Sequence, residues 1–191
     1  MELDSSMNYI VSGLERSGTS MLMQILHNGG YPVAADEKRL PDENNPKGYF
    51  ELEGGKIINK LIEQKFPFNK FKGKIIKITA YGLKYLPPGN YAIIYSERNI
   101  EEILDSMEKM AQINDENRAE TKEVFVKLNS FIKQQITKRD DCNVLFVNYN
   151  QIIENPKEHI EEIFQFLDQE QADLQEMINT VDKRLYRNRK S

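Results

Sequence analysis

The stretch Tyr9-Ile10-Val11-Ser12-Gly13-Leu14-Glu15-Arg16-Ser17-Gly18-Thr19-Ser20-Met21-Leu22 decides the fold. An apolar strand passes through a turn bounded by Gly13 and Gly18 into an amphipathic helix. Backbone N–H groups of residues 16 to 20 can therefore converge on an anion at the positive end of that helix. The pattern predicts a phosphate-binding loop. The alternative is a plain strand-to-helix connection with Ser17 as an ordinary cap.

One position of this loop departs from the pattern of proteins that bind nucleoside triphosphates. Gly13 and Gly18 have the spacing of the two glycines in that pattern, but Thr19 stands where the pattern needs a lysine. The only cation in the loop is Arg16, whose planar guanidinium can make a forked contact to a phosphate or sulfonate. The loop therefore indicates a chemistry different from that of a triphosphatase.

The ends of the expected strands lack a carboxylate suited to magnesium. A magnesium-dependent nucleotide enzyme needs such a carboxylate beside its phosphate loop. Glu97 is the one candidate at a strand end, and Arg98 beside it would neutralise its charge. No metal site is predicted. A P-loop kinase that uses ATP and magnesium is the alternative enzyme.

Outward from the loop, short apolar segments of strand length and helix length alternate along the chain. This alternation predicts an α/β fold of three layers, with a mostly parallel central sheet flanked by helices, as in P-loop NTPases. The expected strands are residues 8–12, 74–79, 91–96 and 143–148. The expected helices are residues 51–64, 99–110, 118–138, 156–167 and 171–181, and the apolar stripes of 99–110 and 156–167 suit them to cover a sheet.

An irregular segment, residues 31–50, interrupts this alternation. It contains Pro32, Pro41, Pro46 and Gly48 and has no clear hydrophobic period. A stretch of that length inside a compact domain is usually a functional loop. We expect it on the substrate side of a single domain spanning residues 1–191.

The composition narrows the function classes. The chain has 191 residues, 39% of them hydrophobic, and a formal net charge of -4, which gives no reason to expect nucleic-acid binding. No apolar run approaches the roughly 20 residues that span a bilayer, so no membrane contact is expected. Cys142 is the only cysteine, which fits a reducing compartment and predicts a cytoplasmic protein.

Two elements resemble the sulfotransferases that use 3′-phosphoadenosine 5′-phosphosulfate (PAPS). Glu15-Arg16-Ser17-Gly18-Thr19-Ser20 looks like the 5′-phosphosulfate loop of that family, in which position 16 is a Lys or Arg. The strand that ends at Arg98, with Ser106 eight residues later, looks like the family's grip on the 3′-phosphate. The resemblance implies a nucleotide site made of Arg16, Ser17, Gly18, Thr19, Ser20, Arg98 and Ser106.

Later segments extend the resemblance over the whole chain. The strand that ends at Tyr149, followed by Glu154-Asn155-Pro156, is similar to the family's late strand, where the tyrosine lies near the adenine. Residues 45–51 and 184–188 look like segments of a compact bacterial branch. The resemblance implies that Arg184 and Arg187 reach the 3′-phosphate, and a solvated chain end is the alternative.

The chain departs from the family at the expected general base. Many cytosolic members carry Lys-x-His at a strand end, and here Lys77 matches the lysine near the bridging oxygen while Thr79 replaces the histidine. A threonine hydroxyl is too weak a base to take an acceptor proton. His27 and His159 read better as surface residues. The remaining candidates are carboxylates, ranked Glu37, then Asp36, then Glu51.

The resemblance therefore implies an enzyme, a PAPS-dependent sulfotransferase that releases 3′-phosphoadenosine 5′-phosphate (PAP). Arg16 and Lys77 would stabilise the charge that develops during transfer. The acceptor would be a small molecule or a glycan, with a hydroxyl favoured over an amine. Because Thr79 replaces the histidine, a non-catalytic homologue that only binds the nucleotide is a further alternative.

Overall fold

Four parallel strands form the centre of the computed structural model, which describes residues 2–36, 38–43, 45–168 and 171–183. The strands β1 (Asn8–Gly13), β2 (Ile75–Lys77), β3 (Tyr91–Glu97) and β4 (Cys142–Asn148) lie in the order β2-β1-β3-β4. All three pairings are parallel, so the carboxyl ends of the strands meet at one edge of the sheet. The predicted α/β fold and all four expected strands are confirmed.

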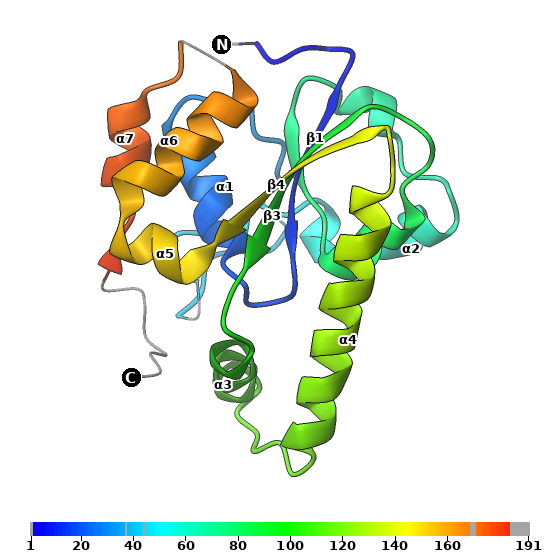
Figure 1. The fold of residues 1–191 in the computed structure, drawn as a ribbon, viewed down its shortest axis with the longest axis vertical. Helices are drawn as coiled ribbons and strands as arrows, with labels where there is room; N and C mark the ends of the chain where they lie inside the picture. Colours follow the sequence, from blue (N-terminus) through cyan, green and yellow to red (C-terminus); the bar gives the residue numbers. More distant parts are fainter. Residues whose placement is uncertain (1, 37, 44, 169–170, 184–191) are drawn as a thin grey trace.

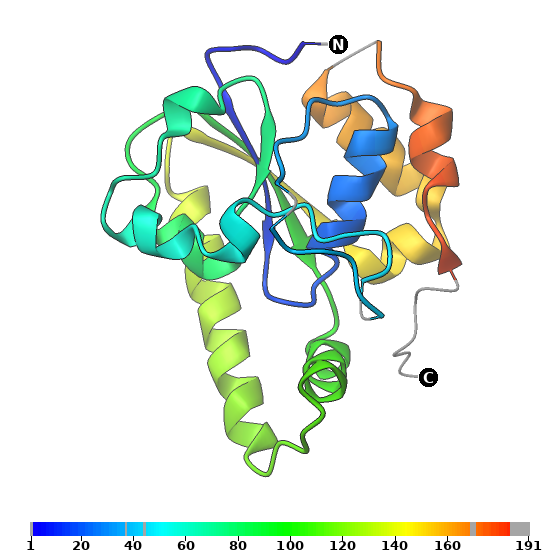
Figure 2. The same cartoon turned by 180° about the vertical axis from the view of Figure 1, so that it is seen from behind.

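Helices cover both faces of the sheet, because alternate strand residues point to opposite sides. Val11 and Ile94 pack in one core with α1 (Thr19–Asn28), α5 (Tyr149–Glu154), α6 (Pro156–Leu167) and α7 (Leu174–Asn179). Ile10 and Ile93 pack in a second core with α2 (Ile58–Ile62) and α4 (Arg118–Thr137). Figures 1 and 2 show these two groups of helices on opposite sides of the sheet, which confirms the three layers.

The helix α3 (Ile100–Ala111) does not cover the sheet as its apolar stripe predicts. It lies past the carboxyl ends of the strands, beside the far end of α4 (Figures 1 and 2). Its buried Ile103 belongs to the same core as Ile132 of α4. The 20 residues of α4 span about 30 Å, more than the roughly 23 Å of a seven-residue strand such as β4, so the extra turns of α4 offer α3 an apolar partner outside the sheet.

The continuous helix expected for residues 51–64 is also wrong. A 3₁₀ turn, η1 (Glu53–Gly55), precedes the five-residue α2. Gly54 and Gly55 have φ angles of +63° and +84°, which an α-helix cannot accommodate, so the helix starts only after them.

The remaining elements are short. Two further 3₁₀ turns are η2 (Phe68–Lys70) and η3 (Ala80–Tyr85). The described part of residues 31–50 contains no helix or strand, and isolated bridges pair Val33 with Ile75 and Asp42 with Asn45. Within the described ranges, no helix is both long and apolar enough to cross a membrane.

Candidate functional site

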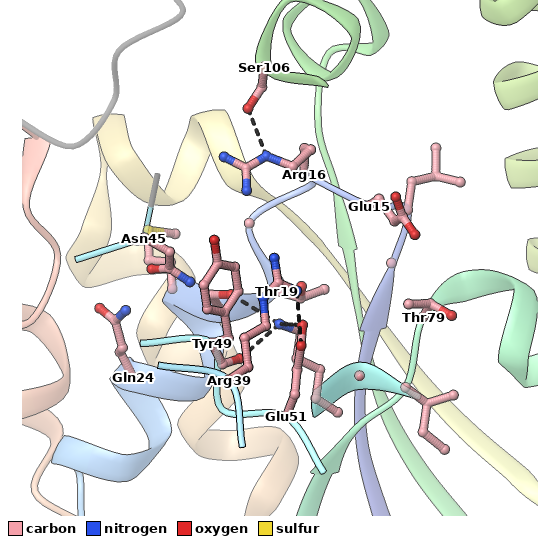
Figure 3. Close-up of a pocket in the computed structure, with 18 of the residues that line it drawn as sticks. Glu15, Arg16, Thr19, Gln24, Arg39, Asn45, Tyr49, Glu51, Thr79 and Ser106 are labelled. Carbon is pink, nitrogen blue, oxygen red and sulfur yellow. Dashed lines mark hydrogen bonds and ion pairs between the residues drawn. The ribbon is translucent and has the colours of Figure 1, made fainter. Parts of the chain in front are cut away.

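A cavity of about 320 Å³ opens where the carboxyl ends of the four strands meet. Open parallel sheets bind ligands at this edge. The walls include Gly13 at the end of β1, Lys77 at the end of β2, Arg98 after β3 and Tyr149 after β4. Figure 3 shows the lining side chains around the start of α1 and the loop that carries Tyr49.

The loop between β1 and α1 is held in one conformation by close contacts. A Cβ atom on Gly13 would lie 2.4 Å from the Ser17 Oγ, and one on Gly18 would lie 2.2 Å from the Tyr149 ring. The Ser96 hydroxyl donates to the Ser17 carbonyl at 2.7 Å, which fixes the loop to β3. The N–H groups of the first turn of α1 therefore face the cavity without helical carbonyl partners, as an anion site requires.

Arg16 joins this loop to α3. Its backbone has a φ of +65°, and its Nε donates to the Ser106 Oγ at 2.9 Å (Figure 3). Burial lowers the pKa of the Arg16 guanidinium, and the Arg98 charge acts in the same direction while Tyr49 opposes it. An arginine stays charged at neutral pH despite such a shift. The structure therefore brings Arg16 and Ser106 together, 90 residues apart in the chain.

Arg98 lies on the same side of the cavity. Its Nη1 donates to the Arg16 carbonyl at 3.0 Å, and its Nε donates to Glu102 at 3.0 Å. The guanidinium lies over the Tyr149 ring, 4.5 Å from its centroid. Arg16, Arg98, Ser106 and Tyr149 thus form one cluster, with Thr19 and Ser20 beside it at the start of α1, whereas Ser17 is buried in the loop and does not line the cavity. We call this cluster and loop the donor side.

Lys77 lines the cavity at the end of β2, with its side chain only 9% exposed. Its Nζ donates to the Ser20 Oγ at 3.0 Å, to the Tyr49 carbonyl at 2.8 Å and to the Glu51 Oε1 at 3.0 Å. Burial lowers the pKa of the Lys77 ammonium, and the Glu51 charge opposes that shift. A cation and a carboxylate thus stand side by side next to the anion site.

Arg39, a third arginine of the cavity, contacts the other carboxylate oxygen of Glu51. The Arg39 Nη1 donates to the Glu51 Oε2 at 3.0 Å, and the Arg39 guanidinium lies 3.5 Å from the Tyr49 ring centroid. The Tyr49 hydroxyl donates to both Asp42 oxygens, at 2.8 and 2.9 Å. Figure 3 shows Arg39, Tyr49 and Glu51 together. We call residues 38–57 the loop side.

The structure changes the order of the candidate bases. Glu51, ranked last from the sequence, lines the cavity, whereas Asp36, ranked second, does not. Burial raises the pKa of Asp36, but backbone hydrogen bonds from Glu53 and Lys38 outweigh burial and hold it below its usual value. Glu37, ranked first, lies outside the described residues.

The other residues considered for the general base also differ in whether they line the cavity. Thr79 lines the cavity, but His27 and His159 do not. The His27 ring contacts Phe50 at 5.6 Å between centroids, and His159 lies 3.6 Å from Glu162, both outside the cavity. Arg184 and Arg187 lie outside the described residues, so their placement near a 3′-phosphate stays a prediction.

Sequence reasoning missed Arg39, the buried Glu102 and its half-buried partner Asn150. The spacing of Glu102, four residues after Arg98 at the start of a helix, is a signal that could have found one of them. Arg39 carries no such signal because it lies in an aperiodic loop.

The chain is similar to a known protein family over almost its whole length. The family model described as "Sulfotransferase domain" matches residues 7–191. No curated protein sequence matches this chain at a significant level. Among solved structures, retinol dehydratase in complex with androsterone and inactive cofactor PAP has a TM-score of 0.53 and 17% identity, covering 94% of this chain and 65% of that chain.

Two further solved structures are similar. Retinol dehydratase with retinol and PAP has a TM-score of 0.53 and 16% identity, covering 93% of this chain and 64% of that one. A sulfotransferase domain from the curacin biosynthetic pathway has a TM-score of 0.45 and 12% identity, covering 93% and 88%. This chain thus spans 65% and 64% of the length of the first two structures, and at these identities they show a shared fold.

Proposed function

Because this chain belongs to the sulfotransferase domain family, we propose that it transfers a sulfuryl group from PAPS to an acceptor hydroxyl, or less readily to an amine. One observation carries the proposal. A single cavity holds the start of α1, the cluster of Arg16, Ser106 and Arg98, and the pair of Lys77 and Glu51. The first two groups suit the two phosphates of the donor, and the pair suits the transfer itself.

The donor is expected to bind along the donor side. The N–H groups at the start of α1, with Arg16, suit the 5′-phosphosulfate, and Arg98 with Ser106 suits the 3′-phosphate. The Tyr149 ring, which already lies beneath Arg98, offers an apolar face to the adenosine. Fixed cations and dipoles of this kind stabilise developing negative charge without having to reorganise.

Lys77 and Glu51 have different proposed roles in the transfer step. The acceptor oxygen attacks sulfur while the bond from sulfur to the bridging phosphate oxygen breaks, and PAP leaves with the charge of that oxygen. Lys77 stabilises this charge, and Glu51 takes the proton of the acceptor hydroxyl. Thr79 supplies no base, so Glu51 is the proposed replacement for the histidine of other members.

The acceptor wall favours a molecule with an apolar body over a highly charged glycan. Apolar side chains line the cavity beside Lys77, namely Leu14, Leu52, Ile57, Ile58, Leu61 and Ile78. The androsterone in one retinol dehydratase structure is an apolar molecule of this type. With Cys142 as the only cysteine, we further propose a cytoplasmic enzyme.

The ATP and magnesium alternative lacks structural support. Glu97, the carboxylate at the end of β3, accepts a hydrogen bond from Lys133 at 2.6 Å and does not line the cavity. Among the described residues, the carboxylates that line the cavity are Glu15, Glu51 and Asp182, and none of them stands at the end of β2 or β3, beside β1, where a P-loop kinase would hold its metal.

Calorimetry with PAP in EDTA, against ATP with magnesium, tests the donor. We expect PAP to bind more tightly, and Arg98→Ala to weaken PAP by about 1.5–3 kcal/mol with little effect on AMP. ATP binding that is tighter and vanishes without magnesium would support a kinase instead. A sulfate-transfer assay with PAPS and apolar alcohols then separates an enzyme from a nucleotide-binding homologue, which would bind PAP without turnover.

A further inference from the structure

Glu102 is a buried carboxylate next to the donor side that the proposed reaction does not use. Its side chain is 2% exposed and that of Arg98 is 7% exposed. The Arg98 Nε donates to Glu102 Oε2 at 3.0 Å, across one turn at the start of α3. Burying a carboxylate is unfavourable unless partners compensate for the lost water, so an ion pair at the surface would stabilise the helix at a lower desolvation cost.

Asn150 fixes Glu102 from the other side. Its Nδ2 donates to both Glu102 oxygens at 3.0 Å, and its Oδ1 accepts from the Asn99 N–H at 3.4 Å. The side chain of Asn148 in turn accepts from the Asn150 N–H at 2.9 Å. The hydrogen bonds from Asn150 to Glu102 and from Arg98 to Glu102 therefore connect the start of α5 to the wall of the cavity.

These hydrogen bonds determine the orientation in which Arg98 can contact an anion. An arginine side chain is long, so ordering it costs rotamer entropy. The Arg98 Nε donates to Glu102, and its Nη1 donates to the Arg16 carbonyl. The plane of the guanidinium packs against the Tyr149 ring. The guanidinium is thus ordered before any ligand arrives, and its position relative to the loop is fixed.

We infer that Glu102 and Asn150 are positioning residues that hold Arg98 to recognise a 3′-phosphate, and so determine the selectivity for a 3′-phosphorylated nucleotide. This inference rests on the proposed donor. It assigns Glu102 a role opposite to its bare charge, since a carboxylate alone would repel the phosphate. Selectivity, not overall affinity, is the property that the two residues control.

Calorimetry of PAP and AMP, which differ only in the 3′-phosphate, tests this role. The measured quantity is the ratio of the two affinities. In Glu102→Gln, one amide oxygen can still accept from Arg98, but the amide nitrogen then faces the donor of Asn150. We expect the ratio to fall about tenfold, the value of one charge-assisted hydrogen bond, while the AMP affinity changes less than about twofold.

A double variant and a neighbouring variant control for structural damage. Adding Asn150→Asp to Glu102→Gln restores an acceptor opposite the new amide, so the ratio should recover. Glu101→Gln removes the adjacent acid, which pairs with Arg118 and Lys122 away from the cavity, and should leave the ratio unchanged. If Glu102→Gln unfolds, Asn150→Ala carries the test with the same expected direction.

The outcomes separate the two proposals. A wild-type protein that binds PAP no better than AMP contradicts the proposed donor itself. A wild-type preference for PAP that persists or grows in Glu102→Gln overturns the positioning role alone, because Glu102 then only reduces the positive charge of Arg98. Equal losses for PAP and AMP, with a lower melting midpoint, also overturn it and leave a structural ion pair.

Discussion

The donor side and the loop side of the cavity are built by different means. On the donor side, Arg98 and Tyr149 lie where strands end, and Gly18 lies where a helix begins, so the sheet itself places them. On the loop side, Arg39 and Glu51 lie in a segment without helix or strand, held by ion pairs and a ring contact. Backbone geometry thus fixes the proposed nucleotide site, whereas contacts between side chains form the proposed acceptor site.

The largest expected effect comes from adding a side chain at Gly18, where the donor loop packs closely against the Tyr149 ring. Gly18→Ala places a Cβ 2.2 Å from the Tyr149 ring at a backbone with φ of +103°. We expect a loss of about 2–4 kcal/mol in the free energy of unfolding and at least a hundredfold weaker binding of PAP. Chemical denaturation and calorimetry measure the two quantities.

A glycine of the loop side provides the matched control. Gly54 has a φ of +63°, but a Cβ there would have Lys38 Cβ at 3.7 Å as its nearest neighbour, an ordinary contact. Gly54→Ala should therefore cost only the backbone strain, about 1–2 kcal/mol, and leave PAP binding close to that of the wild type. Similar losses of PAP binding in both variants would contradict the contrast between the two sides.

The second prediction separates binding from chemistry. Glu51→Gln should lower turnover about a hundredfold or more, because the acceptor proton loses its base, while PAP affinity changes little. Steady-state kinetics and calorimetry on the same preparation measure both.

Glu53→Gln is the control for Glu51, since Glu53 pairs with Lys60 and does not line the cavity. Its turnover should match the wild type. Normal turnover in Glu51→Gln would return the search to Glu37, which the sequence ranked first.

The third prediction concerns pH. Burial lowers the pKa of Lys77 below its usual 10.5, so turnover should fall as pH rises through that lowered pKa, where the ammonium loses its charge. Between the lowered pKa and 10.5 the unfolded chain binds more protons than the folded one, so Lys77 makes stability rise with pH there.

An arginine at this position identifies the group that titrates. Lys77→Arg keeps its charge throughout this range, so the alkaline decline in turnover should move to higher pH even if the maximal rate is lower. An unchanged alkaline limb would show that another group causes the decline.

The smallest effect is expected at the edge of the loop side. The Arg39 side chain is 39% exposed, and exposed ion pairs contribute about 0.2–1 kcal/mol. Arg39→Met should therefore lower stability only slightly. It should reduce turnover several-fold, because Glu51 loses one of the two cations that fix its position. A turnover loss as large as that of Glu51→Gln would mean that Arg39 contacts the reacting groups.

The same contrast explains what the sequence could predict. Lys77 and Arg98, which the family resemblance singled out, line one cavity because residues at the ends of parallel strands converge, and periodicity predicted those strands. The partner of Glu51 could not be predicted, since no period relates Arg39 to it. The position of α3 was wrong for a related reason: an apolar stripe shows that a helix is covered, not which element covers it.

The strand order also has a consequence for synthesis on the ribosome. β1 lies inside the sheet between β2 and β3, so the donor loop cannot assemble when its own residues emerge. The contact from Arg98 to the Arg16 carbonyl spans 82 residues, which at about 5–20 residues per second takes roughly 4–16 s to synthesise. Until β2 has been synthesised, β1 is an unpaired apolar strand with two exposed edges, which makes it a natural segment for a chaperone to protect.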